Sequence, residues 1–206
     1  MAQYFKIHPD NPQKRLIGQA ATIIRDSGVA AYPTDSCYAL GCLFSDKSAI
    51  DRIKQIRQLD DKHHLTLLCR DLTDIGSFAK LDNAAYRLIK SLTPGPYTFL
   101  LKASRDVPRR IQHPQRKTIG LRIPDNRVAL ALLEALGEPM LSTSLILPGA
   151  EDPETDVEQI RAKLGKLIDV IIDGGDGEPE QTSVVDLSGD TPVVVREGKG
   201  DVSRFS

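Results

Sequence analysis

Residues 32–41, YPTDSCYALG, begin at the last residue of the short apolar run of residues 29–32. This run predicts a buried β-strand that stops at Pro33. Hydroxyl and carboxylate side chains then stand at the carboxyl end of the strand, where open α/β sheets bind their ligands. Because Pro, Thr, Asp and Ser also form turns, composition alone favours a turn over a ligand site here.

The apolar residues on both sides of this stretch alternate between helical and strand spacing. Helices are predicted over residues 16–24, 50–56, 85–89, 128–136 and 156–167. Their caps are expected at Ser45 or Asp46, at Asp82, and at Gly28 and Gly137. Strands are predicted over residues 29–32, 65–69, 97–102, 118–123, 140–143, 170–172, 183–187 and 193–196. This mixed order predicts an α/β fold whose sheet includes antiparallel strands.

The bulk composition is that of a globular protein. The chain has 206 residues, of which 40% are hydrophobic and 27% charged, enough for one large domain with a sizeable core. No apolar run is long enough to span a bilayer, and the N-terminus does not resemble a secretory signal. The three cysteines cannot all pair and none lies in a CxxC spacing. We therefore expect a reduced, cytoplasmic protein without a membrane partner.

Charge is distributed unevenly along the chain, although the formal net charge is −1. Residues 102–122 contain seven basic side chains against one acid, whereas residues 151–180 are rich in acids. A basic flank can attract an anionic ligand in a molecule of neutral total charge. A solvated basic loop without a partner explains the charge run equally well.

Three arginines are candidates for holding an anion. Arg57, near the end of the predicted helix 50–56, could grip a phosphate, although a cation there also complements the helix dipole, the simpler interpretation. Arg122 lies in an apolar strand and needs a partner, either a ligand anion or an internal Asp. Arg196 stands in another short strand, and hydroxyl-rich segments occur at residues 141–144 and 181–186. These residues, without a nucleophile triad, favour an anionic ligand held by polar contacts.

Generic metal and nucleotide motifs are missing from the sequence. His63 and His64 have no partner at metal-ligand spacing, so we expect no protein-built metal site. Neither a Walker A sequence nor a GxGxxG loop occurs, so no common motif predicts ATP binding.

The order of several short segments resembles the YrdC/YciO family. These segments are YPTDS at 32–36, the basic residues near 54–57, PGPYT at 94–98, TIGLRIP at 118–124, STS at 142–144, TSVVD at 182–186 and REG at 196–198. Matches run from about residue 14 to residue 200, and we expect a single YrdC-like domain over residues 14–200. The sequences HPDNP at 8–12 and LSTSL at 141–145 resemble the YciO branch.

The resemblance implies a twisted mixed sheet with helices around a large basic cavity. It also implies a nucleotidyltransferase that converts L-threonine, bicarbonate and ATP, with Mg²⁺, to threonylcarbamoyl-AMP and pyrophosphate for the modification of tRNA. By motif position, the nucleotide-binding residues would be Arg57, Thr118, Ser144 and Arg196, together with Lys54, which is one residue out of register with the motif; Arg57 and Arg196 would be the catalytic residues. The threonine-binding residues would be Thr34, Ser36, Arg122 and Thr182.

Two positions depart from the family pattern. Aligning on Arg57 places Gln55 where the synthases have a lysine, and Ile146 stands where they have an asparagine. These departures predict weakened synthase activity, which a Gln55→Lys, Ile146→Asn double variant would raise. The rival hypothesis is a non-catalytic protein that binds double-stranded RNA, tRNA or the ribosome through its basic residues. Arginines that converge on a closed pocket would favour the enzyme, and basic residues spread over an open face would favour RNA.

Overall fold

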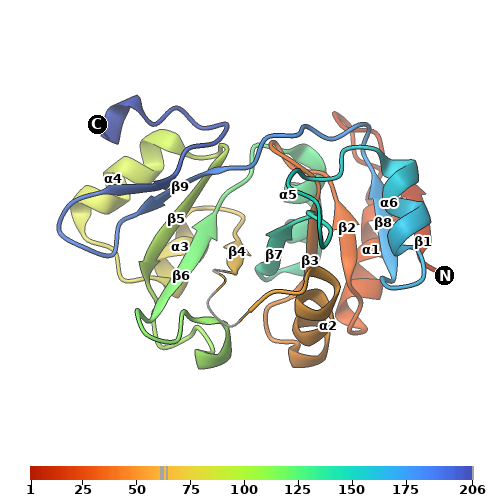
Figure 1. The fold of residues 1–206 in the computed structure, drawn as a ribbon, viewed down its shortest axis with the longest axis horizontal. Coiled ribbons are helices and arrows are strands. Elements are labelled where there is room, and N and C mark those ends of the chain that lie inside the picture. The colour runs from red at the N-terminus through yellow and green to blue at the C-terminus, as the bar shows by residue number, and fades with distance from the viewer. Residues whose placement is uncertain (61–62, 64, 206) are drawn as a thin grey trace.

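The computed structural model describes residues 1–60, 63 and 65–205. Within them, ten strands form one mixed sheet in the order β1-β8-β2-β3-β7-β4-β6-β5-β9-β10 (Figure 1). The strands are β1 (Gln3–Lys6), β2 (Ala30–Tyr32), β3 (Ala39–Leu43), β4 (Thr66–Leu68), β5 (Tyr97–Lys102), β6 (Thr118–Arg122), β7 (Met140–Ser144), β8 (Val170–Asp173), β9 (Ser183–Asp186) and β10 (Val193–Arg196). The pairs β1–β8, β2–β8, β4–β6 and β5–β9 are parallel, and the other five neighbouring pairs are antiparallel.

Six α-helices and two 3₁₀ turns complete the described part of the chain. They are α1 (Lys14–Arg25), α2 (Lys47–Arg57), α3 (Leu72–Phe78), α4 (Asn83–Leu92), α5 (Arg127–Leu136), α6 (Val157–Leu164), η1 (Arg109–Ile111) and η2 (Ser203–Phe205). The expected caps at Asp46, Asp82 and Gly137 are confirmed. The first two carboxylates accept from the backbone of Ala49 and Ala85, and Gly137 ends α5 with φ 77°.

Each face of the sheet packs against helices. Helices α1 and α5 cover one face around Tyr32 and Met140, whereas α2, α3, α4 and α6 cover the other face. Neighbouring residues of a strand alternate between the two clusters, as in β3, where Ala39 joins one and Leu40 the other. The predicted mixed α/β class is therefore confirmed.

The sequence did not predict three elements. The strand β3 begins within the segment 32–41 that was interpreted as a turn and ends two residues beyond it, β1 carries polar residues at both ends, and α3 has only seven residues. Because β1 pairs with β8, residues before position 14 belong to the same sheet. The single-domain boundaries of 14–200 stay a prediction. No helix in the described ranges combines the length and apolar character needed to cross a bilayer.

Gly41 allows β3 to pack closely against its neighbours. One methyl group added at this position should therefore lower the stability of the protein. A Cβ at this position would lie 2.7 Å from both Met140 Cε and Tyr32 Cε1. We expect Gly41→Ala to lower the free energy of unfolding by about 1–3 kcal/mol through overpacking. Gly18 in α1 is the matched control, because a Cβ added there would meet no atom within 4 Å. Gly18→Ala should raise stability by about 0.5–1 kcal/mol. Urea unfolding of both variants tests the prediction, and equal effects would contradict it.

Candidate functional site

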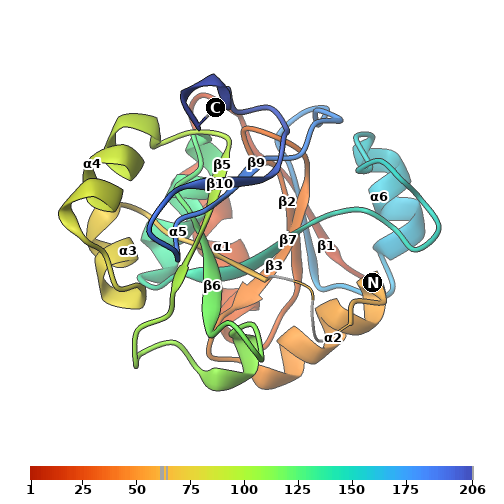
Figure 2. The ribbon, with the colours of Figure 1, turned by 60° about the vertical axis from the view of Figure 1, so that its left-hand side comes forward.

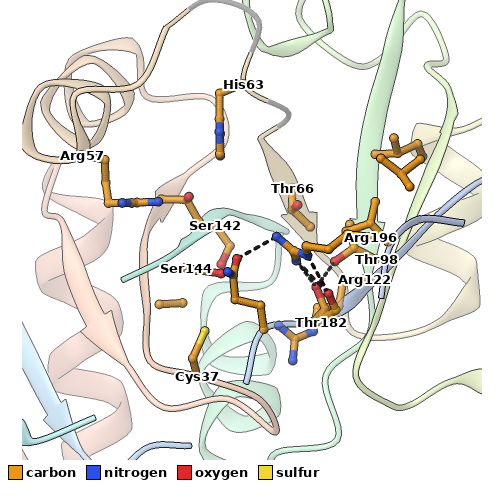
Figure 3. A pocket seen from close by; sticks show the side chains of 16 residues that line it. Cys37, Arg57, His63, Thr66, Thr98, Arg122, Ser142, Ser144, Thr182 and Arg196 are labelled. Atoms are coloured by element: carbon orange, nitrogen blue, oxygen red, sulfur yellow. Dashed lines mark hydrogen bonds between the residues drawn. The ribbon is translucent and has the colours of Figure 1, made fainter. Parts of the chain in front are cut away.

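A cavity of about 450 Å³ opens among β3, β4, β5, β6, β7, β9 and β10 near the end of α2 (Figure 3). Its lining includes three arginines, several hydroxyl groups and a short apolar wall. The lining residues are Cys37, Ala39, Arg57, His63, Thr66, Thr98, Leu100, Arg122, Ser142, Thr143, Ser144, Gln181, Thr182, Val184, Val195 and Arg196. This volume falls within the range of small-molecule sites in proteins, about 300–1,000 Å³.

Arg57 is the last residue of α2 and reaches the cavity from the helix end. Ile50 and Ile53 bury the apolar side of this helix in the core, and Gln58 ends it with a left-handed backbone at φ 52°. The guanidinium of Arg57 makes no hydrogen bond or ion pair within the described residues, and its Nε is buried without a partner. Burial lowers the pKa of Arg57, so its charge is held at a cost. An anionic ligand would relieve that cost.

Arg122 enters the cavity from β6 and binds the loop that follows β2. Its Nη2 forms an ion pair with Asp35 Oδ1 and also lies 3.4 Å from Thr34 Oγ1 and 3.2 Å from Ser36 Oγ. The two charged side chains are only 9% and 10% exposed. Arg122 Nε and Asp35 Oδ2 are buried without a partner in the described part of the chain. The internal Asp expected as one alternative is therefore present, and it leaves part of the guanidinium unused.

Arg196 is held by the residues just before β9. Its Nε and Nη2 donate to the Thr182 carbonyl at 3.0 and 2.8 Å, and its Nη1 donates to Gln181 Oε1 at 2.7 Å. The Thr182 hydroxyl contacts both Arg196 Nη2 at 3.1 Å and the Thr98 hydroxyl at 2.9 Å. Burial lowers the pKa of Arg196, and the positive charge of Arg122 lowers it further, against an opposite effect of Cys37. Burial is the largest of these effects, so the charge of Arg196, like that of Arg57, is held at a cost.

The remaining walls combine hydroxyl groups with apolar side chains. Strand β7 contributes Ser142 and Ser144, and Ser142 Oγ lies 2.6 Å from the hydroxyl of buried Tyr32. Burial raises the pKa of Tyr32, so this phenol stays protonated at neutral pH. Leu100 and Val184 supply an apolar surface opposite these groups. The cavity can therefore accept a ligand with an anionic end and a flat apolar end.

The structure brings most of the expected site residues together. Five of them line the cavity, namely Arg57, Arg122, Ser144, Thr182 and Arg196. Thr34 and Ser36 lie behind the lining and contact Arg122. Lys54 and Thr118 are not among the lining residues. Lys54 lies one helical turn before Arg57, and Thr118 is buried at the opposite end of β6 from Arg122, with its hydroxyl unpartnered in the described residues.

Neither departure from the family pattern lies at the cavity. Gln55 is exposed on the outer side of α2, in a separate surface groove with Lys47, Asp51 and Arg52. Ile146 is half-buried and does not line the cavity. A lysine at 55 would point away from the site, so the expected gain of the Gln55→Lys, Ile146→Asn variant loses its physical basis.

Several lining residues were not expected from the sequence. Thr66 and Thr98 stand in strands that were interpreted as structural, and Cys37 and His63 had no assigned role. Thr98 and Leu100 alternate with the core residues Phe99 and Leu101, so the two-residue period of β5 was the available signal. No group of three or more metal-ligating side chains occurs in the described ranges.

Comparison with known proteins identifies the family. The family model Sua5_yciO_yrdC, described as "Telomere recombination", matches residues 22–198. The chain belongs to this family. It is 58% identical to YciO of Escherichia coli (strain K12) over 205 residues, covering 100% of both chains. The crystal structure of E. coli YciO matches all of both chains with a TM-score of 0.97.

Two further relatives carry names that describe an activity or a ligand. Threonylcarbamoyl-AMP synthase of Chromobacterium violaceum is 38% identical over 148 residues, which cover 71% of this chain and 76% of that enzyme. P. abyssi Sua5 complexed with L-threonine is 28% identical, with a TM-score of 0.88 over 96% of this chain and 58% of the Sua5 chain. The chain is thus homologous to threonylcarbamoyl-AMP synthases and shares the YrdC-like fold of Sua5.

Replacing Arg57 or Arg122 by alanine should affect stability differently, because Arg122 has an internal ion pair and Arg57 has none among the described residues. Arg57→Ala removes a half-buried charge that has no hydrogen-bond or ion-pair partner among the described residues, so the free energy of unfolding should stay within about 0.5 kcal/mol of the parent or rise. Arg122→Ala leaves the Asp35 carboxylate buried and unpaired, which should cost about 3–5 kcal/mol. Urea unfolding at pH 7 measures both values. A large loss of stability in Arg57→Ala would show that this arginine has a structural role.

Proposed function

We propose that this protein binds ATP and L-threonine in the cavity and synthesises threonylcarbamoyl-AMP. The observation that carries the proposal is the convergence of Arg57, Arg122 and Arg196 on one nucleotide-sized cavity. The three come from α2, β6 and β10. Like charges gathered from three elements repel one another unless an anionic ligand binds between them.

The nucleotide would bind with its phosphates toward Arg57 and Arg196. Arg57 has unused hydrogen-bond donors, and guanidinium groups suit phosphate oxygens because they donate in a planar fork. Ser144 would add a hydroxyl contact from β7. The apolar surface of Leu100, Val184 and Val195 would accept the adenine ring. Neither Lys54 nor Thr118 lines the cavity, so Thr118 keeps only its assignment by motif position and Lys54 only its place one residue out of register with the motif lysine.

Threonine would bind on the side of Arg122. Its carboxylate would accept from the Arg122 guanidinium, which lines the cavity, while Thr34 and Ser36 help to hold that side chain in place. The Thr182 hydroxyl lies between Arg196 and Thr98 and would meet the ligand near the middle of the cavity. The homology to threonylcarbamoyl-AMP synthases and the fold shared with a threonine-bound Sua5 support threonine as a ligand.

The reaction needs no protein nucleophile. Loss of hydroxide from bicarbonate gives carbon dioxide, and the threonine amine attacks its carbon. The proton that the amine releases combines with the hydroxide to form water, and a carbamate remains. A carbamate oxygen then attacks the α-phosphorus of ATP, and the bond to the β-phosphate breaks to release pyrophosphate. Arg57 and Arg196, as catalytic residues, would stabilise the charge on the transferring and departing phosphates. Mg²⁺ would enter with the ATP phosphates, since the described residues contain no ligand cluster of their own for it. The product would feed threonylcarbamoyladenosine formation in tRNA.

Incubation of the protein with ATP, Mg²⁺, bicarbonate and L-threonine tests the activity. We expect pyrophosphate and threonylcarbamoyl-AMP to appear together, and both to depend on threonine. Single omissions of bicarbonate, threonine and ATP are the controls. Hydrolysis of ATP without the adenylate, or no turnover at all in a folded protein, would contradict the proposal.

Arginine variants should separate the two halves of the cavity. We expect Arg57→Ala to weaken ATP binding most and Arg122→Ala to weaken threonine binding most, each by about 1.5–3 kcal/mol, as for charge-assisted hydrogen bonds. Calorimetric titration of both ligands into each variant measures this, with a melting curve to confirm folding. Unchanged ATP affinity in folded Arg57→Ala would remove the nucleotide assignment.

The second candidate function is RNA binding, and one observation favours it. The charged residues Lys102, Arg105, Arg109, Arg110, Arg116 and Lys117 are exposed, outside the cavity lining. Such a surface could bind tRNA, double-stranded RNA or the ribosome with a steep dependence on salt. Arg110 and Arg116 already contact the Ser45 carbonyl and Asp186, which reduces the donors left for phosphates. The convergence inside the cavity therefore makes the enzyme the stronger proposal.

A further inference from the structure

The C-terminal segment, which follows the cavity residue Arg196, folds back against the first residues of β5 and β9. Figure 2 shows it lying above the ends of β5 and β9. We call residues 197–201 the C-terminal strap. Ser183 Oγ donates to the Gly200 carbonyl at 2.6 Å and accepts from the Gly198 amide at 2.9 Å, and Tyr97 donates to the Asp201 carbonyl at 3.1 Å. The strap therefore has a defined position on the sheet.

The two strap glycines allow this close approach. A Cβ at Gly198 would lie 2.5 Å from the Gln181 carbonyl oxygen, and a Cβ at Gly200 would lie 2.5 Å from the Tyr97 ring. Neither distance is possible for a side chain without movement of the backbone or the ring. The strap therefore fixes the position of the residue between the two glycines, which is Lys199.

Lys199 extends from the strap to the loop after β2. Its Nζ donates to the Asp35 carbonyl at 2.7 Å and forms an ion pair with Glu178. The side chain is 30% exposed, and that of Glu178 is 56% exposed. An ion pair this exposed adds little stability by itself. The bond to the Asp35 carbonyl, by contrast, joins the strap to the residue that pairs with Arg122.

The loop formed by residues 34–37 is thus held from two sides. Arg122 binds its side chains at Thr34, Asp35 and Ser36, and Lys199 binds its backbone at Asp35. The ion pair between Arg122 and Asp35 uses one nitrogen and one oxygen, and leaves Nε and Oδ2 buried without partners in the described residues. A bidentate ion pair with two hydrogen bonds, here called the two-bond pairing, would give both Arg122 Nε and Asp35 Oδ2 a partner. A contact outside this ion pair must therefore hold the loop in a position that prevents Arg122 and Asp35 from forming the second bond.

We propose that Lys199 is this anchor and acts as a positioning residue for carboxylate binding by Arg122. The inference rests on the proposed threonine site and adds a residue to it. Without the Lys199 bond, Asp35 moves toward the two-bond pairing and takes up the guanidinium donors that the ligand carboxylate needs. ATP binding depends on Arg57 and Arg196 instead, and Arg196 is held by Gln181 and Thr182 independently of the Lys199 side chain.

The test compares Lys199→Met, Lys199→Arg and the matched control Lys166→Met, which alters an exposed lysine of another loop. By calorimetry, Lys199→Met should bind threonine about tenfold more weakly, as for one lost charge-assisted bond, with ATP affinity within about twofold of the parent. Lys199→Arg should restore most of the threonine affinity, and Lys166→Met should match the parent. The melting temperature should stay within about 2 °C in all three. A purely structural role would not separate the two ligands in this way.

Hydrogen exchange of peptides covering residues 34–37, in the protein without ligand, tests the anchor independently of any activity. We expect Lys199→Met to exchange faster there than the parent, and Lys166→Met to exchange at the parent rate. If the parent binds no threonine, the proposed function fails, while faster exchange would still support the anchor. Unchanged exchange in Lys199→Met, or equal weakening of ATP and threonine, would overturn the proposal.

Discussion

The ion pair between Arg122 and Asp35 is the interaction on which the site depends. It joins two residues 87 positions apart and connects β6 to the loop after β2. Because both side chains are nearly buried, loss of either partner would strand a charge in a region of low dielectric. The pair therefore fixes the wall of the cavity, yet it leaves one guanidinium nitrogen unpartnered in the described residues.

The arginines of the cavity illustrate a balance between stability and ligand binding. Arg57 and Arg196 both have lowered pKa values because burial disfavours their charged forms. The buried isoleucines of α2 anchor Arg57, and hydrogen bonds to Gln181 and Thr182 hold Arg196 on the partly exposed edge strand β10. Positive charge held at a cost in the free protein favours binding of an anion, which removes the cost.

The sequence predicted the fold class and named five residues that line the cavity, the three arginines by their charge and Ser144 and Thr182 only by motif position. A charged residue in an apolar strand must find a partner, which singled out Arg122, and helix caps at Asp46 and Asp82 follow from local hydrogen bonding. The misplaced residues required three-dimensional information. Thr118 shares a strand with Arg122 but lies four residues away, about 13 Å along β6. The strap contact of Lys199 could not be predicted, because it joins residues 164 positions apart.

A crystal structure of the protein with L-threonine and a non-hydrolysable ATP analogue tests the central claim most directly. We predict the threonine carboxylate within hydrogen-bond distance of Arg122, the phosphates between Arg57 and Arg196, and the base against Leu100 and Val184. Ligands bound outside this cavity, or a cavity that stays empty at saturating concentrations of both, would contradict the claim that the three arginines form a substrate site.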